Sequence, residues 1–78
     1  MVDPELAKRL AYCITWCRFH SHATVPQAQE ALRAKFEGRT LSGIAIAHVL
    51  MYSRREDEGP ITPELLADID LHLRRETN

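Results

Sequence analysis

Two copies of one helix-start pattern, a capping residue followed by proline and glutamate, constrain the fold of this chain most strongly. Asp3-Pro4-Glu5 and Thr62-Pro63-Glu64 each place a side-chain oxygen before a proline at the first helical position, where the missing N–H of proline is not needed. The glutamate then lies near the positive end of the helix, which favours its charge. Each pattern therefore predicts the start of a helix.

Between these two starts the sequence predicts the end of the first helix and a short second one. The apolar pattern of the first helix extends to about Ser21, where we expect that helix to end. Thr24 and Gln27 have the spacing of a capping box, in which each side chain bonds to the backbone N–H of the other. Gly38 provides the left-handed stop that commonly ends a helix.

The third predicted helix is the most apolar segment. Thr40 or Ser42 can cap its start, and residues 44–52 are apolar apart from the polar His48. Because apolar residues occur on nearly every side, we expect this helix to be buried. The other helices each have one apolar face, and no segment shows the alternation of a strand. The sequence therefore predicts an all-α fold, a compact bundle of about four helices around a buried central third helix.

The length of the chain predicts a single helical domain over residues 1–78, because 78 residues enclose one apolar core. No apolar run has the length that a membrane span requires. The first residues are charged where a secretory signal would be apolar. We therefore expect a cytoplasmic protein without a membrane association.

Residues 13–22, CITWCRFHSH, combine two cysteines with two histidines and two aromatic residues. At about 100° per residue, both cysteines fall in the middle of the apolar stripe of the first helix. Small thiols are among the most frequently buried side chains. The sequence therefore predicts that this stripe belongs to the core, and its members are Leu6, Leu10, Cys13, Ile14 and Cys17.

A zinc site is the functional alternative for this segment. Cys13, Cys17 and His20 share one side of the helix, and His22 or His48 would supply a fourth ligand. However, structural zinc sites usually separate two cysteines by two residues, and the spacing Cys-x3-Cys-x2-His-x-His matches no common zinc finger. We therefore predict no metal and no other cofactor.

An aromatic stripe lies beside the cysteine stripe. Tyr12, Trp16 and Phe19 are spaced four and three residues apart, so they share one side of the first helix. Either the second helix covers these rings as part of the core, or they form a surface for a partner or for a homodimer. Arg9 and Arg18 flank the stripe and complete the candidate surface.

The charges are unevenly distributed along the chain. Residues 1–55 contain eight Lys or Arg and four acids, whereas residues 56–78 contain two Arg and seven acids. The acidic segment is either an ordinary solvated surface or a surface that docks on a basic groove of a partner. The candidate docking residues are Glu56, Asp57, Glu58, Glu64 and Asp68.

Motifs of known chemistry are absent from the sequence. It has no glycine-rich phosphate loop and no nucleophile elbow, so we predict a non-enzymatic protein without catalytic residues. The second and third helices have the proportions of a helix-turn-helix, but residues 41–44 offer few polar groups to bases. A small dimeric DNA-binding regulator, with Arg39, Arg54 and Arg55 gathered into a patch, remains the alternative function.

In its size, its lack of catalytic motifs and its acidic end (residues 56–58 with Glu64, Asp68 and Asp70), the chain resembles the small helical inhibitors that bacteriophages encode, including anti-CRISPR proteins. The resemblance implies a protein that occupies a basic surface of a host nucleic-acid-binding complex and excludes DNA. We therefore expect a protein-binding module that self-associates through the first helix as a homodimer and does not bind nucleic acid directly.

Overall fold

Four helices make up most of the chain that the structure, a computed structural model, describes, which is residues 3–55 and 59–77. They are α1 (Pro4–Phe19), α2 (Val25–Lys35), α3 (Gly43–Arg55) and α4 (Pro63–Thr77). No strand occurs in these residues. The predicted all-α fold is confirmed. Within the same residues, no helix is both long and apolar enough to cross a membrane.

The predicted caps form at the helix starts. The Leu6 N–H donates to the Asp3 carboxylate at 3.4 Å, and Thr24 and Gln27 make both bonds of the capping box at 2.9 and 3.4 Å. Ser42, the second of the two candidates for α3, accepts an N–H from the first turn at 3.2 Å. Thr62 does the same for α4 at 3.2 Å. Local capping therefore sets where every described helix begins.

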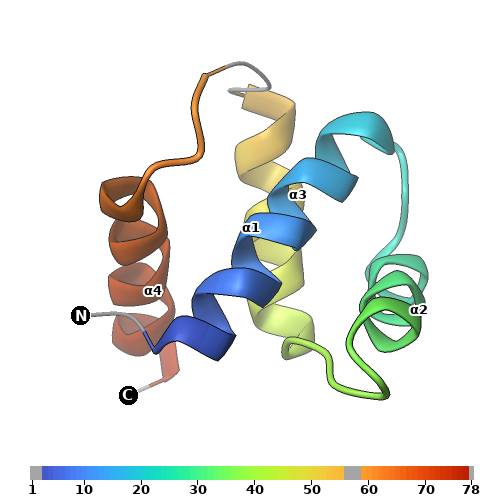
Figure 1. Ribbon diagram of the computed structural model, residues 1–78. Helices are drawn as coiled ribbons and strands as arrows, with labels where there is room; N and C mark the ends of the chain where they lie inside the picture. The colour runs from blue at the N-terminus through green and yellow to red at the C-terminus, as the bar shows by residue number, and fades with distance from the viewer. Residues whose placement is uncertain (1–2, 56–58, 78) are drawn as a thin grey trace.

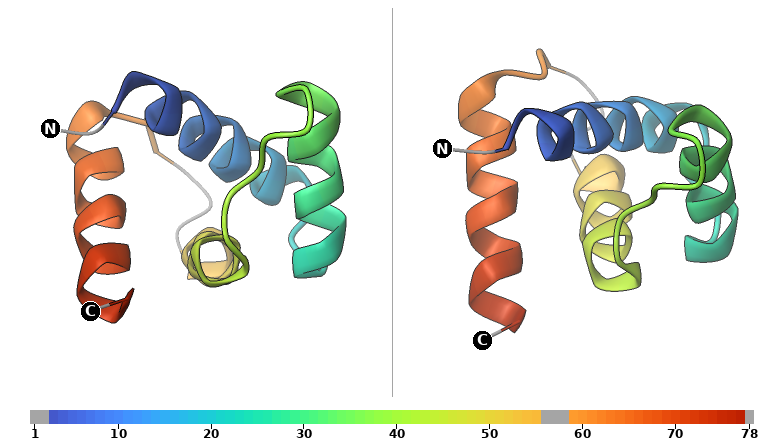
Figure 2. Two further views of the ribbon diagram at one scale, coloured as in Figure 1. Left: turned by 90° about the horizontal axis from the view of Figure 1, so that it is seen from below. Right: turned by 60° about the horizontal axis from the view of Figure 1, so that its bottom comes forward.

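α1 and α3 form the central pair of the bundle. α1 lies across the other three helices, whereas α2 and α4 flank α3 on opposite sides, as Figures 1 and 2 show. α3 packs mainly against α1 and α2 and less extensively against α4. The predicted bundle around the third helix is therefore confirmed. In this bundle α2 and α4 cover opposite sides of α3.

The core lies where the helices meet. α1 contributes the predicted cysteine stripe and α3 contributes its inner side, with smaller contributions from α2 and α4. One side of α3 remains exposed, because Ile44 and Met51 are 51% and 52% exposed. The largest fully buried side chains are Leu10, Cys13, Ile14, Cys17, Leu32, Ile46, Val49 and Ser53.

The stop after α2 differs in detail from the prediction. Gly38 has a φ of +90°, but Glu37, directly before it, is also left-handed with a φ of +53°. The Gly38 N–H donates to the Arg33 carbonyl at 2.9 Å, which is the closing bond of a Schellman motif. In that motif the left-handed residue is usually glycine, and here it is glutamate.

Glu37→Gly is therefore expected to raise the free energy of unfolding by about 0.5 to 1 kcal/mol, because glycine adopts a positive φ without steric cost. Urea unfolding followed by circular dichroism measures the change. Glu37→Ala is the matched control, since it removes the same side chain but keeps the Cβ atom. A gain for alanine equal to that for glycine would contradict the backbone explanation.

Candidate functional site

α2 covers the first ring of the aromatic stripe. The Tyr12 ring packs edge-on against Phe36 with a centroid distance of 5.6 Å, and the Lys35 ammonium lies 5.9 Å from the Tyr12 ring centroid. Tyr12 is half-buried in this contact. It therefore belongs to the packing between α1 and α2 and adds little to the free surface.

The other two rings line a hollow at the end of α1. Trp16 is half-buried, whereas Phe19 is 81% exposed. We name this space, about 470 Å³ in volume, the aromatic hollow. Its lining consists of Trp16, Phe19, His20, Ser21, His22, Ala23 and Gln27.

Trp16 is held in place by His20. The two rings stack with a centroid distance of 4.2 Å and an interplanar angle of 14°. Nδ1 of His20 lies 2.9 Å from the carbonyl oxygen of Trp16. Because a carbonyl only accepts, the Nδ1 atom carries the proton in this bond. The stack therefore presents a fixed, flat aromatic wall to the hollow.

A second hollow joins the first. It has a volume of about 360 Å³ and shares His22 and Ala23 with the aromatic hollow. Ala47, Leu50 and the half-exposed Met51 of α3 form its other wall. We name the two hollows together the apolar surface. It runs from the end of α1 across the α1–α2 connection to the exposed side of α3.

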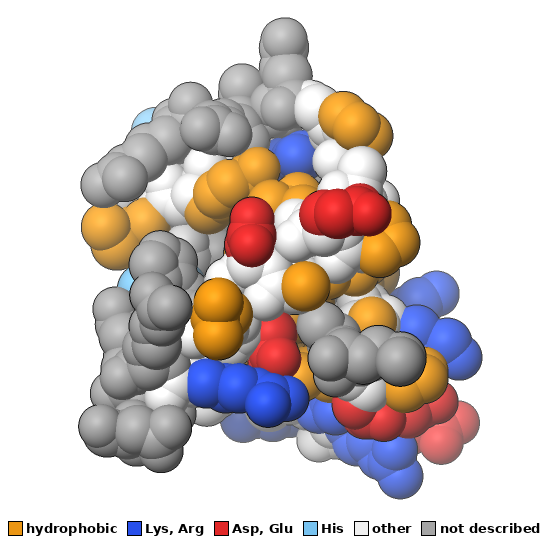
Figure 3. Space-filling view, turned by 90° about the vertical axis from the view of Figure 1, so that its left-hand side faces the viewer, with side chains coloured by type: hydrophobic (Ala, Val, Ile, Leu, Met, Phe, Trp, Pro, Cys, Tyr) orange, Lys and Arg blue, Asp and Glu red, His pale blue; other side chains and the backbone are white. Residues whose placement is uncertain are grey.

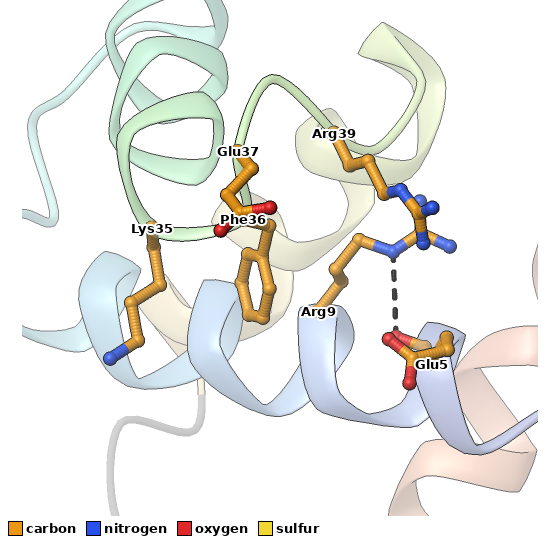
Figure 4. A pocket seen from close by; sticks show the side chains of 6 residues that line it. All are labelled: Glu5, Arg9, Lys35, Phe36, Glu37 and Arg39. Carbon is orange, nitrogen blue, oxygen red and sulfur yellow. Dashed lines mark hydrogen bonds between the residues drawn. The ribbon is translucent and has the colours of Figure 1, made fainter.

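Arg9 lies away from the apolar surface, near the end of α2. Its Nη1 donates to the Thr40 carbonyl at 3.0 Å and its Nε to the Glu5 carbonyl at 3.4 Å. Figure 4 shows that it reaches the same hollow as Arg39. This hollow, about 420 Å³ in volume, is lined by Glu5, Arg9, Lys35, Phe36, Glu37 and Arg39.

Arg18 also makes a hydrogen bond that stabilises the fold. Its Nη1 donates to the Gly59 carbonyl at 2.8 Å, which links α1 to the segment before α4. Its Nε and Nη2 are buried without a hydrogen-bond partner among the residues that the structure describes. The two arginines expected to flank one surface therefore bind backbone carbonyls in two different places.

The cysteines lie in the core, as predicted. Cys13 and Cys17 are buried free thiols whose sulfur atoms are 3.9 Å apart. The hydrogen bond with Cys17 and burial raise the pKa of Cys13 well above its ordinary value, so this thiol stays protonated. Among the side chains that the structure describes, no three of His, Cys, Asp or Glu are grouped as metal ligands.

The charged candidates are spread over several places. Glu64 and Asp68 are exposed on α4, whereas residues 56–58 lie outside the described residues. Arg39 precedes the start of α3, and Arg54 and Arg55 belong to its last turn, so within one chain these arginines lie at opposite ends of that helix. The basic patch of the DNA-binding alternative therefore does not form in a single copy.

No sequence pattern indicated the part of the apolar surface that lies on α3. Residues 44–52 are apolar on nearly every side of the helix and predicted a buried central element. The other three described helices leave one side of it open. Comparison of the chain with protein-family models, curated proteins and solved structures found no match. The functional proposal therefore rests on the surface of the molecule itself.

Proposed function

We propose that the protein is a non-enzymatic module that binds another protein through the apolar surface. The observation that carries the proposal is the 81% exposure of Phe19 beside the Trp16 wall of a hollow of about 470 Å³. Aromatic side chains beside a pocket are the usual anchors of protein interfaces. The half-exposed Met51 extends the apolar area, and methionine adapts readily to the shape of a partner.

The narrower form of this proposal is an inhibitor that acts in the cytoplasm on a host nucleic-acid-binding complex, such as a CRISPR effector. The acidic residues Glu64 and Asp68 support it, because they favour a basic partner surface. They lie on α4, which flanks α3 on the side opposite α2 (Figure 1). A partner that reaches both the apolar surface and these acids therefore has to extend around the molecule.

The apolar side of α3 favours protein binding over the DNA-binding alternative. A recognition helix presents polar and basic side chains to base edges. Among the described side chains of α3, the exposed large hydrophobic ones are Ile44 and Met51, which have no hydrogen-bonding group for a base. The same side chains suit an apolar partner surface.

Phe19→Ser is expected to weaken binding to the partner by about tenfold or more without unfolding the protein, because an exposed anchor contributes to the interface and not to the core. The measurement is capture from a host lysate on immobilised protein, followed by mass spectrometry and titration of the captured protein. Ala34→Ser is the control, since Ala34 is an exposed apolar residue of α2 that lines neither hollow and lies on a different helix from Glu64 and Asp68.

A partner retained equally by both variants would contradict the assignment of the surface. A titration with duplex DNA tests the alternative at the same time. Salt-sensitive DNA binding that survives Phe19→Ser and is lost in Arg39→Ser would replace the proposal with the DNA-binding function.

A further inference from the structure

The hollow between α1 and the end of α2 gathers positive charge away from the apolar surface. It shares no lining residue with the two hollows of that surface. Three of its side chains are cations, and these are Arg9, Lys35 and Arg39. Its volume of about 420 Å³ is in the usual range for a site that holds a small molecule. We name it the basic hollow.

Arg9 is fixed at one wall of the basic hollow. Its Nη1 donates to the Thr40 carbonyl at 3.0 Å and its Nε to the Glu5 carbonyl at 3.4 Å, and the side chain is half-buried. A carbonyl group carries no net charge, so these bonds position the cation without neutralising it. The guanidinium keeps N–H groups for a further acceptor, because it has more donors than these two bonds use.

Arg39 brings a second guanidinium to the same end of the hollow. Arg9 bonds to the carbonyl of Thr40, the residue directly after Arg39, and Figure 4 shows both head groups at this end. The exposed side chain of Arg39 has no hydrogen bond or ion pair with the residues that the structure describes. Like charges repel at short range, so an anion that contacts both groups stabilises this arrangement.

The two acids of the basic hollow leave its guanidinium groups without an ionic partner. The Glu5 carboxylate pairs with Lys8 at 3.8 Å, and Lys8 lies outside the hollow. Figure 4 shows the Glu37 carboxylate near Phe36, away from the arginine head groups. In the described part of the chain, neither acid forms an ion pair with an arginine of the hollow. The arginine end is therefore free to attract an anion.

Phe36 gives the basic hollow an aromatic wall next to its positive end. The ring is half-buried and is held by its edge-on contact with Tyr12, at a centroid distance of 5.6 Å. Figure 4 shows it between Lys35 and Arg9. Flat organic rings stack favourably on aromatic side chains. A flat ring in contact with Phe36 therefore places an attached anionic group at the arginine end.

The outward face of α4 lacks these features. Figure 3 looks onto α4 and shows acidic and hydrophobic side chains interspersed there, with Lys and Arg in the lower part of the view. Glu64 and Asp68 are exposed on this helix. Because these carboxylates repel an anion, the basic hollow is the better place for an anionic ligand.

We propose that the basic hollow binds a small phosphate monoester whose organic part contains a flat ring, such as a nucleoside monophosphate. Two guanidinium groups offer paired N–H donors to the oxygens of a terminal phosphate. The charge of this group, about −1.5 to −2 at neutral pH, exceeds that of a carboxylate or a phosphodiester. The inference does not depend on the proposed function, because the basic hollow is separate from the apolar surface.

Titration of the full chain with adenosine monophosphate, followed by amide NMR shifts, tests the site. We expect a dissociation constant of about 1 mM or lower, with the largest shifts among residues 36–40. Inorganic phosphate is expected to bind at least about fivefold more weakly, because it lacks a ring to stack on Phe36. Adenosine, which lacks the phosphate, is expected to cause no shift at these residues.

Arg39→Gln removes one guanidinium from an exposed position and is expected to weaken binding of adenosine monophosphate by about tenfold. Arg39→Lys keeps the charge but loses the paired donors, so its affinity is expected to lie between those of Arg39→Gln and the wild type. Arg33→Gln is the matched control. It removes the same charge from α2, where Arg33 pairs with Glu30 at 2.7 Å outside the hollow, and it is expected to change the affinity less than about twofold. Circular dichroism confirms that the variants fold.

Absence of binding at about 10 mM adenosine monophosphate would overturn the inference. Binding that tolerates Arg39→Gln, or that Arg33→Gln weakens equally, would also overturn it, because the phosphate would then lie elsewhere. Equal affinities for inorganic phosphate and adenosine monophosphate would remove the contact with Phe36. Duplex DNA without terminal phosphates that binds the same residues more tightly than adenosine monophosphate would replace the inference with the DNA-binding alternative.

Discussion

Ile46→Ala is expected to lower the free energy of unfolding by about 3 kcal/mol, a large part of the stability available to a domain of this size. Ile46 is 0% exposed and belongs to the side of α3 that faces the core. Truncation removes buried apolar contacts and leaves a cavity that the neighbouring helices do not fill. Urea or thermal unfolding followed by circular dichroism measures the loss.

Ile44→Ala provides the matched control. It makes the same substitution two residues earlier in α3, where the side chain is 51% exposed. Its loss is expected to be below about 1 kcal/mol, because little buried surface disappears. Equal losses for the two variants would mean that α3 does not face the core as described.

Stability is expected to fall steeply in alkaline solution because of Cys13. Its hydrogen bond with Cys17 and its burial raise the pKa of the thiol in the folded protein. The folded state therefore keeps its proton above the unfolded thiol pKa of about 8.5, where the unfolded state loses it. The stabilisation is fully present below that pH and is lost as the pH rises above it. The decline is about 1.4 kcal/mol per pH unit, or about 2 to 3 kcal/mol between pH 8.5 and pH 10.5.

The measurement is a series of urea unfolding curves over this pH range, under reducing conditions. The double variant Cys13→Ala/Cys17→Ala removes both thiols, because burial alone would raise the pKa of Cys17 once Cys13 is gone. It is less stable at neutral pH because it loses packing, so the slope with pH is compared and not the absolute value. A flatter slope for the double variant supports the assignment. Parallel slopes for the wild type and the double variant would show that other groups, such as tyrosine and lysine, cause the alkaline loss.

The helices were predictable because their signals are local. Asp3, Thr24 and Thr62 were identified as caps from the sequence, and each bonds to its own first turn in the structure. Helix ends were less accurate: α1 ends at Phe19, two residues before the expected position. The left-handed conformation of Glu37 was also missed, because its side chain gives no sign of it.

The candidate surface was only partly predictable, because it depends on which helices cover which rings. The spacing of Tyr12, Trp16 and Phe19 places them on one side of α1, but only the packing of Phe36 separates Tyr12 from the other two. The bond between Arg18 and Gly59 joins residues 41 positions apart. No local sequence pattern indicates such a long-range contact. Arg18 was therefore interpreted as a surface group, as was Arg9.

Trp16 is the one tryptophan of the chain, and it lines the aromatic hollow with its indole ring against His20. Indole emission depends on contact with water. The fluorescence spectrum of the unmodified protein therefore reports whether this hollow is filled. The molecule thus contains its own optical probe at the place where we expect a ligand to bind, and no label has to be attached there.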